Sequence, residues 1–67
     1  MNFKVGRILI LRGKTLRGKN RIKEFGNKWE ILTIGPSGKT LLIKPITQSD
    51  AYMRWIQITN DEHFEIA

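Results

Sequence analysis

The sequence predicts a small all-β protein whose five strands form one strongly bent barrel. Short segments rich in β-branched and aromatic residues alternate with turn signals along the whole chain. The chain has 67 residues, which is enough for a single domain (residues 1–67) with one core and no second lobe. Strands this short cannot lie as an open sheet with two wet faces, so their apolar faces must meet. An SH3-like barrel is expected, with an OB-like barrel as the alternative.

Five strands are expected over residues 5–12, 29–34, 41–46, 55–59 and 63–66. A tight turn over residues 35–38 separates the second strand from the third. Pro45 marks an edge or a stop, because proline donates no hydrogen bond to a neighbouring strand. The predicted interior consists of Val5, Ile8, Ile10, Ile31, Leu42, Ile56, Ile58 and Ile66.

The connections are less regular than the strands. Residues 13–20 contain two glycines and several polar or basic side chains, a composition typical of a loop. Residues 21–25 fit either a strand that continues a hairpin or one helical turn capped by Asn20 and closed by Gly26. A single helical turn near residues 49–52 is also expected, with Ser49 as its cap.

Positive charge is concentrated in the first two thirds of the chain. Residues 1–44 hold eleven basic and two acidic residues, a net charge of +9, whereas residues 45–67 hold one basic and four acidic residues, a net charge of −3. Such a surplus of positive charge favours polyanionic partners. The expected phosphate-contacting residues are Arg12, Lys14, Arg17, Lys19, Arg21, Lys23 and Lys28.

The arrangement of this basic stretch depends on its secondary structure. If the stretch were extended, Arg17, Lys19, Arg21 and Lys23 would share one face. Aromatic side chains beside such cations can stack on nucleic-acid bases, and Trp29 and Trp55 are the candidates. The alternative is that both tryptophans belong to the core, as large aromatic residues usually do.

We predict no catalytic residue, no metal ligand set and no cofactor. The chain lacks cysteine, and its only histidine, His63, lies where a terminal strand tends to fray. Residues 13–19 match GxxxxGK, but Asn20 replaces the Ser or Thr that would bind Mg²⁺. Residues 37–40 end in GKT, but Thr33 stands where the first glycine should be. Either loop could still hold a phosphate through its backbone N–H groups without hydrolysing anything.

Gly6, residues 8–11, Gly13, Gly18-Lys19 and Ile22 resemble a KOW-type element of the SH3-like barrels in ribosomal and transcription-associated proteins. The resemblance covers about a third of the chain. It implies a strand that enters a Gly-Lys loop, and a loop that contacts RNA or a protein partner. The chain departs from the family in having one residue more between the first two loop glycines, and Arg21 in place of a following glycine.

The leading expectation is therefore a non-enzymatic module that binds nucleic acid, DNA or RNA. The alternative is a small regulator or adaptor, of the kind a phage encodes, that docks on an acidic surface of a larger protein. Its acidic end (Asp61, Glu62 and Glu65) could then pair with a second copy in a homodimer. An enzymatic role would require that the chain complete another chain's site. A cytoplasmic protein with no membrane association is expected, because the longest apolar run has four residues and no signal peptide is evident.

Overall fold

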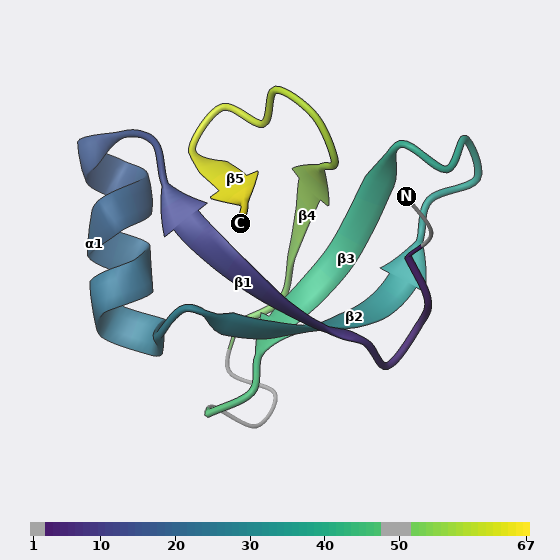
Figure 1. Ribbon diagram of the computed structural model, residues 1–67, viewed down its shortest axis with the longest axis horizontal. Coiled ribbons are helices and arrows are strands. Elements are labelled where there is room, and N and C mark those ends of the chain that lie inside the picture. The colour runs from purple at the N-terminus through teal and green to yellow at the C-terminus, as the bar shows by residue number, and fades with distance from the viewer. Residues whose placement is uncertain (1–2, 48–51) are drawn as a thin grey trace.

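The computed structural model describes residues 3–47 and 52–67. Its elements are β1 (Ile8–Gly13), α1 (Leu16–Phe25), β2 (Lys28–Ile34), β3 (Thr40–Pro45), β4 (Arg54–Gln57) and β5 (Phe64–Ile66). All five expected strands are present, close to their predicted bounds. Figure 1 shows the strands curled around a common interior, with α1 at one side of them. The predicted class, a small all-β barrel, is confirmed.

The five strands form one antiparallel sheet in the order β4-β3-β2-β1-β5, which bends into a nearly closed barrel. Sequential neighbours β2, β3 and β4 form a meander, and the last strand returns to lie beside the first. The long connection between β1 and β2 carries α1. The order of a strand, a long connection, three successive strands and a final strand suits the SH3-like barrel that was the leading expectation.

A β-bulge in β2 contributes to the bend. The β2–β3 pairing runs in one register up to Ile31 opposite Ile43 and resumes one residue out of step at Thr33 opposite Leu42. Leu32 is therefore an extra residue in β2. An extra residue bends its strand and increases the local twist, which helps so short a sheet to curl.

The core is built from Leu9, Leu11, Trp29, Ile31, Leu41, Ile43, Ile56 and Phe64. Two predicted interior residues, Ile31 and Ile56, belong to it. Ile58 and Ile66, also predicted to be interior, are partly buried and pack against it.

The predicted interior is wrong for β1 and β3. Ile8 and Ile10 are exposed, Leu42 is only half-buried, and Val5, which precedes β1, is exposed. In both strands the inward positions are one residue away from those expected. The physical reason is that these strands carry apolar residues at successive positions, so alternation does not specify which face is buried.

α1 contradicts the prediction of a loop over residues 13–20. Thr15 is the N-cap, and its Oγ1 accepts a hydrogen bond from the N–H of Gly18 at 3.1 Å. The helix ends at Gly26, whose φ is 90° and whose N–H donates to the carbonyl of Ile22 at 2.7 Å. Residues 21–25 are thus helical and closed by Gly26, as one alternative held, but Thr15 caps the helix instead of Asn20.

Two glycines let α1 lie close to the backbone of its neighbours. A Cβ atom on Gly13 would overlap the backbone of Gly18 and Lys19, and a Cβ atom on Gly18 would overlap the carbonyl oxygen of His63. Gly18 is the buried residue of the helix. The glycines of the GxxxxGK segment therefore serve helix packing, and a helix begins inside the segment where a phosphate loop would need open backbone.

Asp61 bridges the two edge strands of the barrel, β4 and β5. Its buried carboxylate accepts hydrogen bonds from the N–H groups of Gln57 at 2.9 Å and of His63 and Phe64 at 3.1 Å each. Gln57 ends β4 and Phe64 begins β5. One side chain thus satisfies backbone donors of both edges and fixes the connection between them.

The predictions about the two turns and about Pro45 have different outcomes. The turn after β2 is confirmed, with the N–H of Gly38 donating to the carbonyl of Gly35 at 2.9 Å. Pro45 does end β3, but β3 lies between β2 and β4, so its interpretation as an edge residue is wrong. The helical turn expected near residues 49–52 falls largely on residues 49–51, which lie outside the described residues.

Candidate nucleic-acid interface

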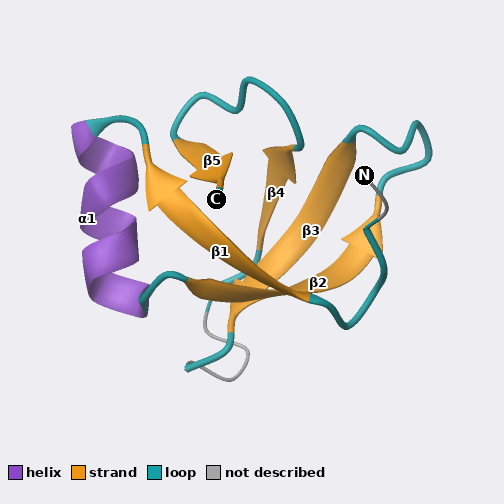
Figure 2. Ribbon diagram, in the orientation of Figure 1, coloured by secondary structure: helices purple, strands orange, loops and turns teal. Residues whose placement is uncertain are grey.

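The helix distributes the basic residues around its surface. Figure 2 shows α1 alongside the strands, with one side turned away from them. Lys19 and Lys23 are one turn apart and lie on the same side of α1, whereas Arg17 lies on the side that carries Arg21. The expectation that these four side chains share one face is wrong, because it assumed an extended chain.

Three of the seven predicted cations have partners within the protein. Arg12 pairs with Glu65, its neighbour across the β1–β5 ladder, with 3.3 Å between Nε and Oε1. The Nζ of Lys14 donates to the main-chain carbonyl of Asp61 at 2.7 Å. The first contact links β5 to β1. The second links the turn before β5 to the residue that follows β1.

The third partnered cation, Arg21, lies on α1. Its Nη1 is 3.1 Å from Oε1 of Glu24, one turn further along the helix. Its guanidinium also lies over the ring of Tyr52, 5.4 Å from the ring centroid. Arg21 is consequently held between a carboxylate and an aromatic ring.

The other four predicted cations are exposed and form no ion pair among residues 3–47 and 52–67. They are Arg17, Lys19, Lys23 and Lys28. Lys28 opens β2, directly after the two residues that follow α1. These four cations lie on two sides of α1 and at the start of β2, and they are here together called the α1 cationic surface.

The two tryptophans have opposite environments. Trp29 has no exposed surface and donates its indole N–H to the carbonyl of Gly26 at 3.0 Å, so its predicted stacking role is wrong. Trp55 is 48% exposed and projects from the outer face of β4. Both faces of the sheet carry apolar residues, and only the register places one tryptophan inside and the other outside.

His63 is engaged within the fold. Its Nδ1 is 2.8 Å from Oγ1 of Thr15, and its Nε2 is 3.7 Å from Oε1 of Glu62. Within the described chain, no three His, Asp or Glu side chains lie close enough to hold a metal ion. Thr15 was not singled out from the sequence. A signal was available, because Thr is a favoured residue at the start of a helix and the glycine of the later Phe-Gly pair favours its end.

Sequence reasoning also left Arg54 out of the site, although it is the only basic residue after residue 44. It lies in β4 with its guanidinium over the ring of Phe64, 4.6 Å from the centroid, and its Nη1 donates to Oη of Tyr52 at 3.2 Å. The position of Arg54 between two aromatic residues in an otherwise acidic segment was the available signal.

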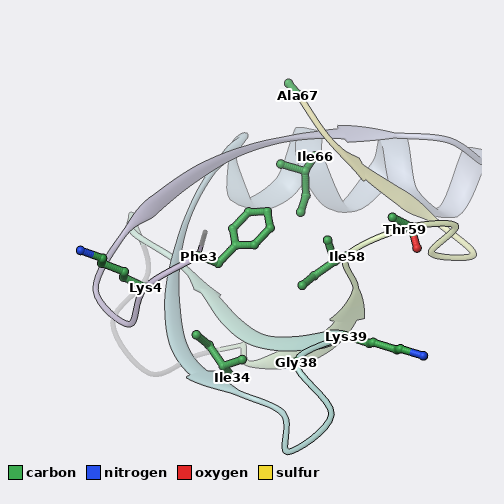
Figure 3. A pocket seen from close by; sticks show the side chains of 9 residues that line it. All are labelled: Phe3, Lys4, Ile34, Gly38, Lys39, Ile58, Thr59, Ile66 and Ala67. Atoms are coloured by element: carbon green, nitrogen blue, oxygen red, sulfur yellow. The ribbon is translucent and has the colours of Figure 1, made fainter. Parts of the chain in front are cut away.

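An apolar hollow of about 870 Å³ opens at the end of the barrel opposite α1. In Figure 3 the side chains of Phe3, Ile58 and Ile66 point into it, whereas those of Lys4 and Lys39 extend away from it. Neither lysine of the described lining therefore points into the hollow, which shares no residue with the α1 cationic surface.

Comparison with protein-family models, curated proteins and solved structures found no match to this chain. The helix found in the described chain has ten residues and is too short to cross a membrane.

Proposed function

We propose that the protein is a non-enzymatic nucleic-acid-binding module that contacts the phosphate backbone of DNA or RNA. The observation that supports this most directly is the α1 cationic surface, where four exposed cations lack an acidic partner within the described residues. Three acids of the described chain have other partners, and one of them, Glu24, pairs with Arg21. Asp61 is occupied by three N–H groups, and Glu65 pairs with Arg12.

Phosphate binding to such a surface is driven largely by the release of counterions. Each phosphate neutralised by Lys or Arg lowers the slope of log affinity against log salt by about 0.7 for single strands and 0.9 for duplex DNA. The four free cations contribute most directly, since binding through them breaks no internal contact. The three partnered cations remain candidates: Arg12, Lys14 and Arg21. Each would have to share its positive charge between a phosphate and its present partner in the protein.

Trp55 adds a means of contacting bases. An exposed indole on a β-sheet face can stack on an unpaired base of any type, which favours single-stranded nucleic acid. Because Trp29 is buried, this role falls to Trp55 alone of the two tryptophans.

The test is binding of labelled single-stranded and duplex oligonucleotides over a series of salt concentrations. We expect the double variant Lys19→Gln/Lys23→Gln to bind more weakly, with a salt slope about 1.4 to 1.8 units shallower than that of the wild type. The matched control is Lys4→Gln/Lys39→Gln, which removes the same charge at the other end of the barrel. Equal losses in the two variants would show only a general effect of net charge, and no binding at low salt would refute the proposal.

A second function, docking on an acidic surface of a larger protein, is favoured by one observation. Ile8 and Ile10 are 45% and 38% exposed on the outer face of β1, and Ile10 lies opposite Lys28. Apolar side chains beside a cation suit a protein surface, whereas a phosphate backbone does not need them. A single stoichiometric protein partner that survives nuclease treatment, and is lost in Ile8→Ser/Ile10→Ser, would support this function over the first.

A further inference from the structure

The guanidinium of Arg54 forms no ion pair with an acid among residues 3–47 and 52–67. Arg54 occupies an inward position of β4, two residues before Ile56 of the core. Its Nε is buried and makes no hydrogen bond to any described residue. The ion pairs among described residues are Arg12 with Glu65, Arg21 with Glu24 and His63 with Glu62, and none includes Arg54. A partly buried cation in this state is stabilised by an added anion.

Two contacts of Arg54 hold it in place, and neither of them is with an acid of the described chain. The ring of Phe64 supports one face of the guanidinium, and the hydroxyl of Tyr52 accepts one of its N–H groups. Both partners are neutral. Arg54 as a whole is half-buried, so part of the residue is still open to solvent.

Tyr52 brings a second cation to the same place. Its ring is stacked on Phe25, with 4.8 Å between the centroids and 6° between the planes, and packs edge-on against Trp29. Arg21 of α1 lies over this ring, while Arg54 of β4 donates to its hydroxyl. The Tyr52 oxygen accepts from Arg54, so its own O–H remains able to donate. Two guanidiniums thus contact the same tyrosine, and the one acid that an ion pair places beside them within the described chain is Glu24.

We propose that Arg54 and Tyr52, with Arg21 beside them, form a binding site for one phosphate group. Planar guanidinium donors match the oxygen atoms of a phosphate, and a hydroxyl supplies a further donor. Arg21 belongs to α1, so the site extends the α1 cationic surface around the end of the barrel to β4, the strand that carries Trp55. The identity of the phosphate rests on the function proposed above, under which it belongs to the nucleic-acid backbone.

The first test is made on the wild-type protein by NMR. The Nε–H signal of Arg54 should be observable, because Nε is buried, and it is followed during titration with a single-stranded oligonucleotide and, separately, with inorganic phosphate. We expect a saturable shift with both, at a much lower concentration of oligonucleotide than of phosphate. A shift with inorganic phosphate alone would keep the site and refute its assignment to nucleic acid. No shift with either ligand would overturn the site.

The second test uses Arg54→Met, which keeps an unbranched stem over Phe64 but removes the charge, and Tyr52→Phe, which keeps the stacked ring but removes the hydroxyl. Arg54→Met should bind the oligonucleotide about tenfold more weakly and lower the salt slope by about one unit. Tyr52→Phe should weaken binding less and leave the slope unchanged, because it removes no charge.

Lys4→Met is the matched control for loss of one charge, and urea unfolding shows whether each variant is folded. If Arg54→Met does not fold, Tyr52→Phe and the NMR titration still decide. If the wild type binds nucleic acid and both variants bind it with unchanged affinity and slope, the phosphate site is wrong and the general function stands. If the wild type binds no nucleic acid, the proposed function fails and the titration with inorganic phosphate alone decides on the site.

Discussion

The hydroxyl of Thr15 lies 2.8 Å from Nδ1 of His63, although 48 positions separate the two residues in the sequence. The same Oγ1 accepts the N–H of Gly18 in the first turn of α1, and the carbonyl of His63 accepts the N–H of Lys14 at 2.7 Å. Thr15 therefore both begins the helix and fastens it to the turn before β5. The position of the cationic residues of α1 depends on this junction.

We expect Thr15→Val to lower the free energy of unfolding by about 1–2 kcal/mol, because it removes the N-cap and the contact with His63 without changing the side-chain volume. Urea unfolding measures the change. Thr15→Ser keeps the hydroxyl and should lose less than half as much. Equal losses in the two variants would mean that the methyl group matters and the hydroxyl does not.

Gly18→Ala should destabilise the protein by about 1–3 kcal/mol, although alanine is the better helix former. The reason is that the new Cβ would overlap the carbonyl oxygen of His63. Asn20→Ala, at an exposed position of the same helix, is the control and should be neutral or slightly stabilising. A Gly18→Ala variant as stable as the wild type would show that α1 does not pack as described.

Asp61→Ala should cost about 2–4 kcal/mol in the free energy of unfolding, since the substitution leaves the N–H groups of Gln57, His63 and Phe64 without their acceptor. The adjacent Glu62, whose side chain is 85% exposed, offers a control. Glu62→Ala should change stability by less than about 0.5 kcal/mol. Similar effects of the two substitutions would contradict the bridging role of Asp61.

Fluorescence should separate the two tryptophans. Acrylamide is expected to quench Trp55 and to leave Trp29 largely protected, because Trp29 is fully buried. A single-stranded oligonucleotide should quench the wild type through stacking on Trp55 and should have little effect on Trp55→Phe. Quenching that persists in the variant would exclude Trp55 as the stacking residue.

The strands could be predicted from the sequence because each is a short run of β-branched or aromatic residues between turn signals. Which residues point inward could not. In β1, the run from Ile8 to Leu11 is apolar at every position, so either face could have been the buried one. The choice was made by the pairing of Leu9 with Trp29, a contact between strands that no local pattern contains.

The helix was missed for a related reason. Its inward side is marked only by Gly18, Ile22 and Phe25, and glycine usually argues against a helix. Gly18 is present because the helix must approach the carbonyl of His63 closely, which is a tertiary requirement. The error carried over to the candidate site, since an extended stretch and a helix place the same four cations on different faces.

The pairing of β5 with β1 also affects the order in which the protein is assembled. The basic stretch is synthesised early, but the contacts that fix the N-terminal end of α1 come from His63, just before β5. In a nascent chain that still lacks β5, Phe25 of α1 can pack against Trp29, but the start of the helix lacks the ring and the carbonyl of His63. The start of α1, and with it the position of the first cations of the helix, is therefore fixed only when β5 pairs with β1.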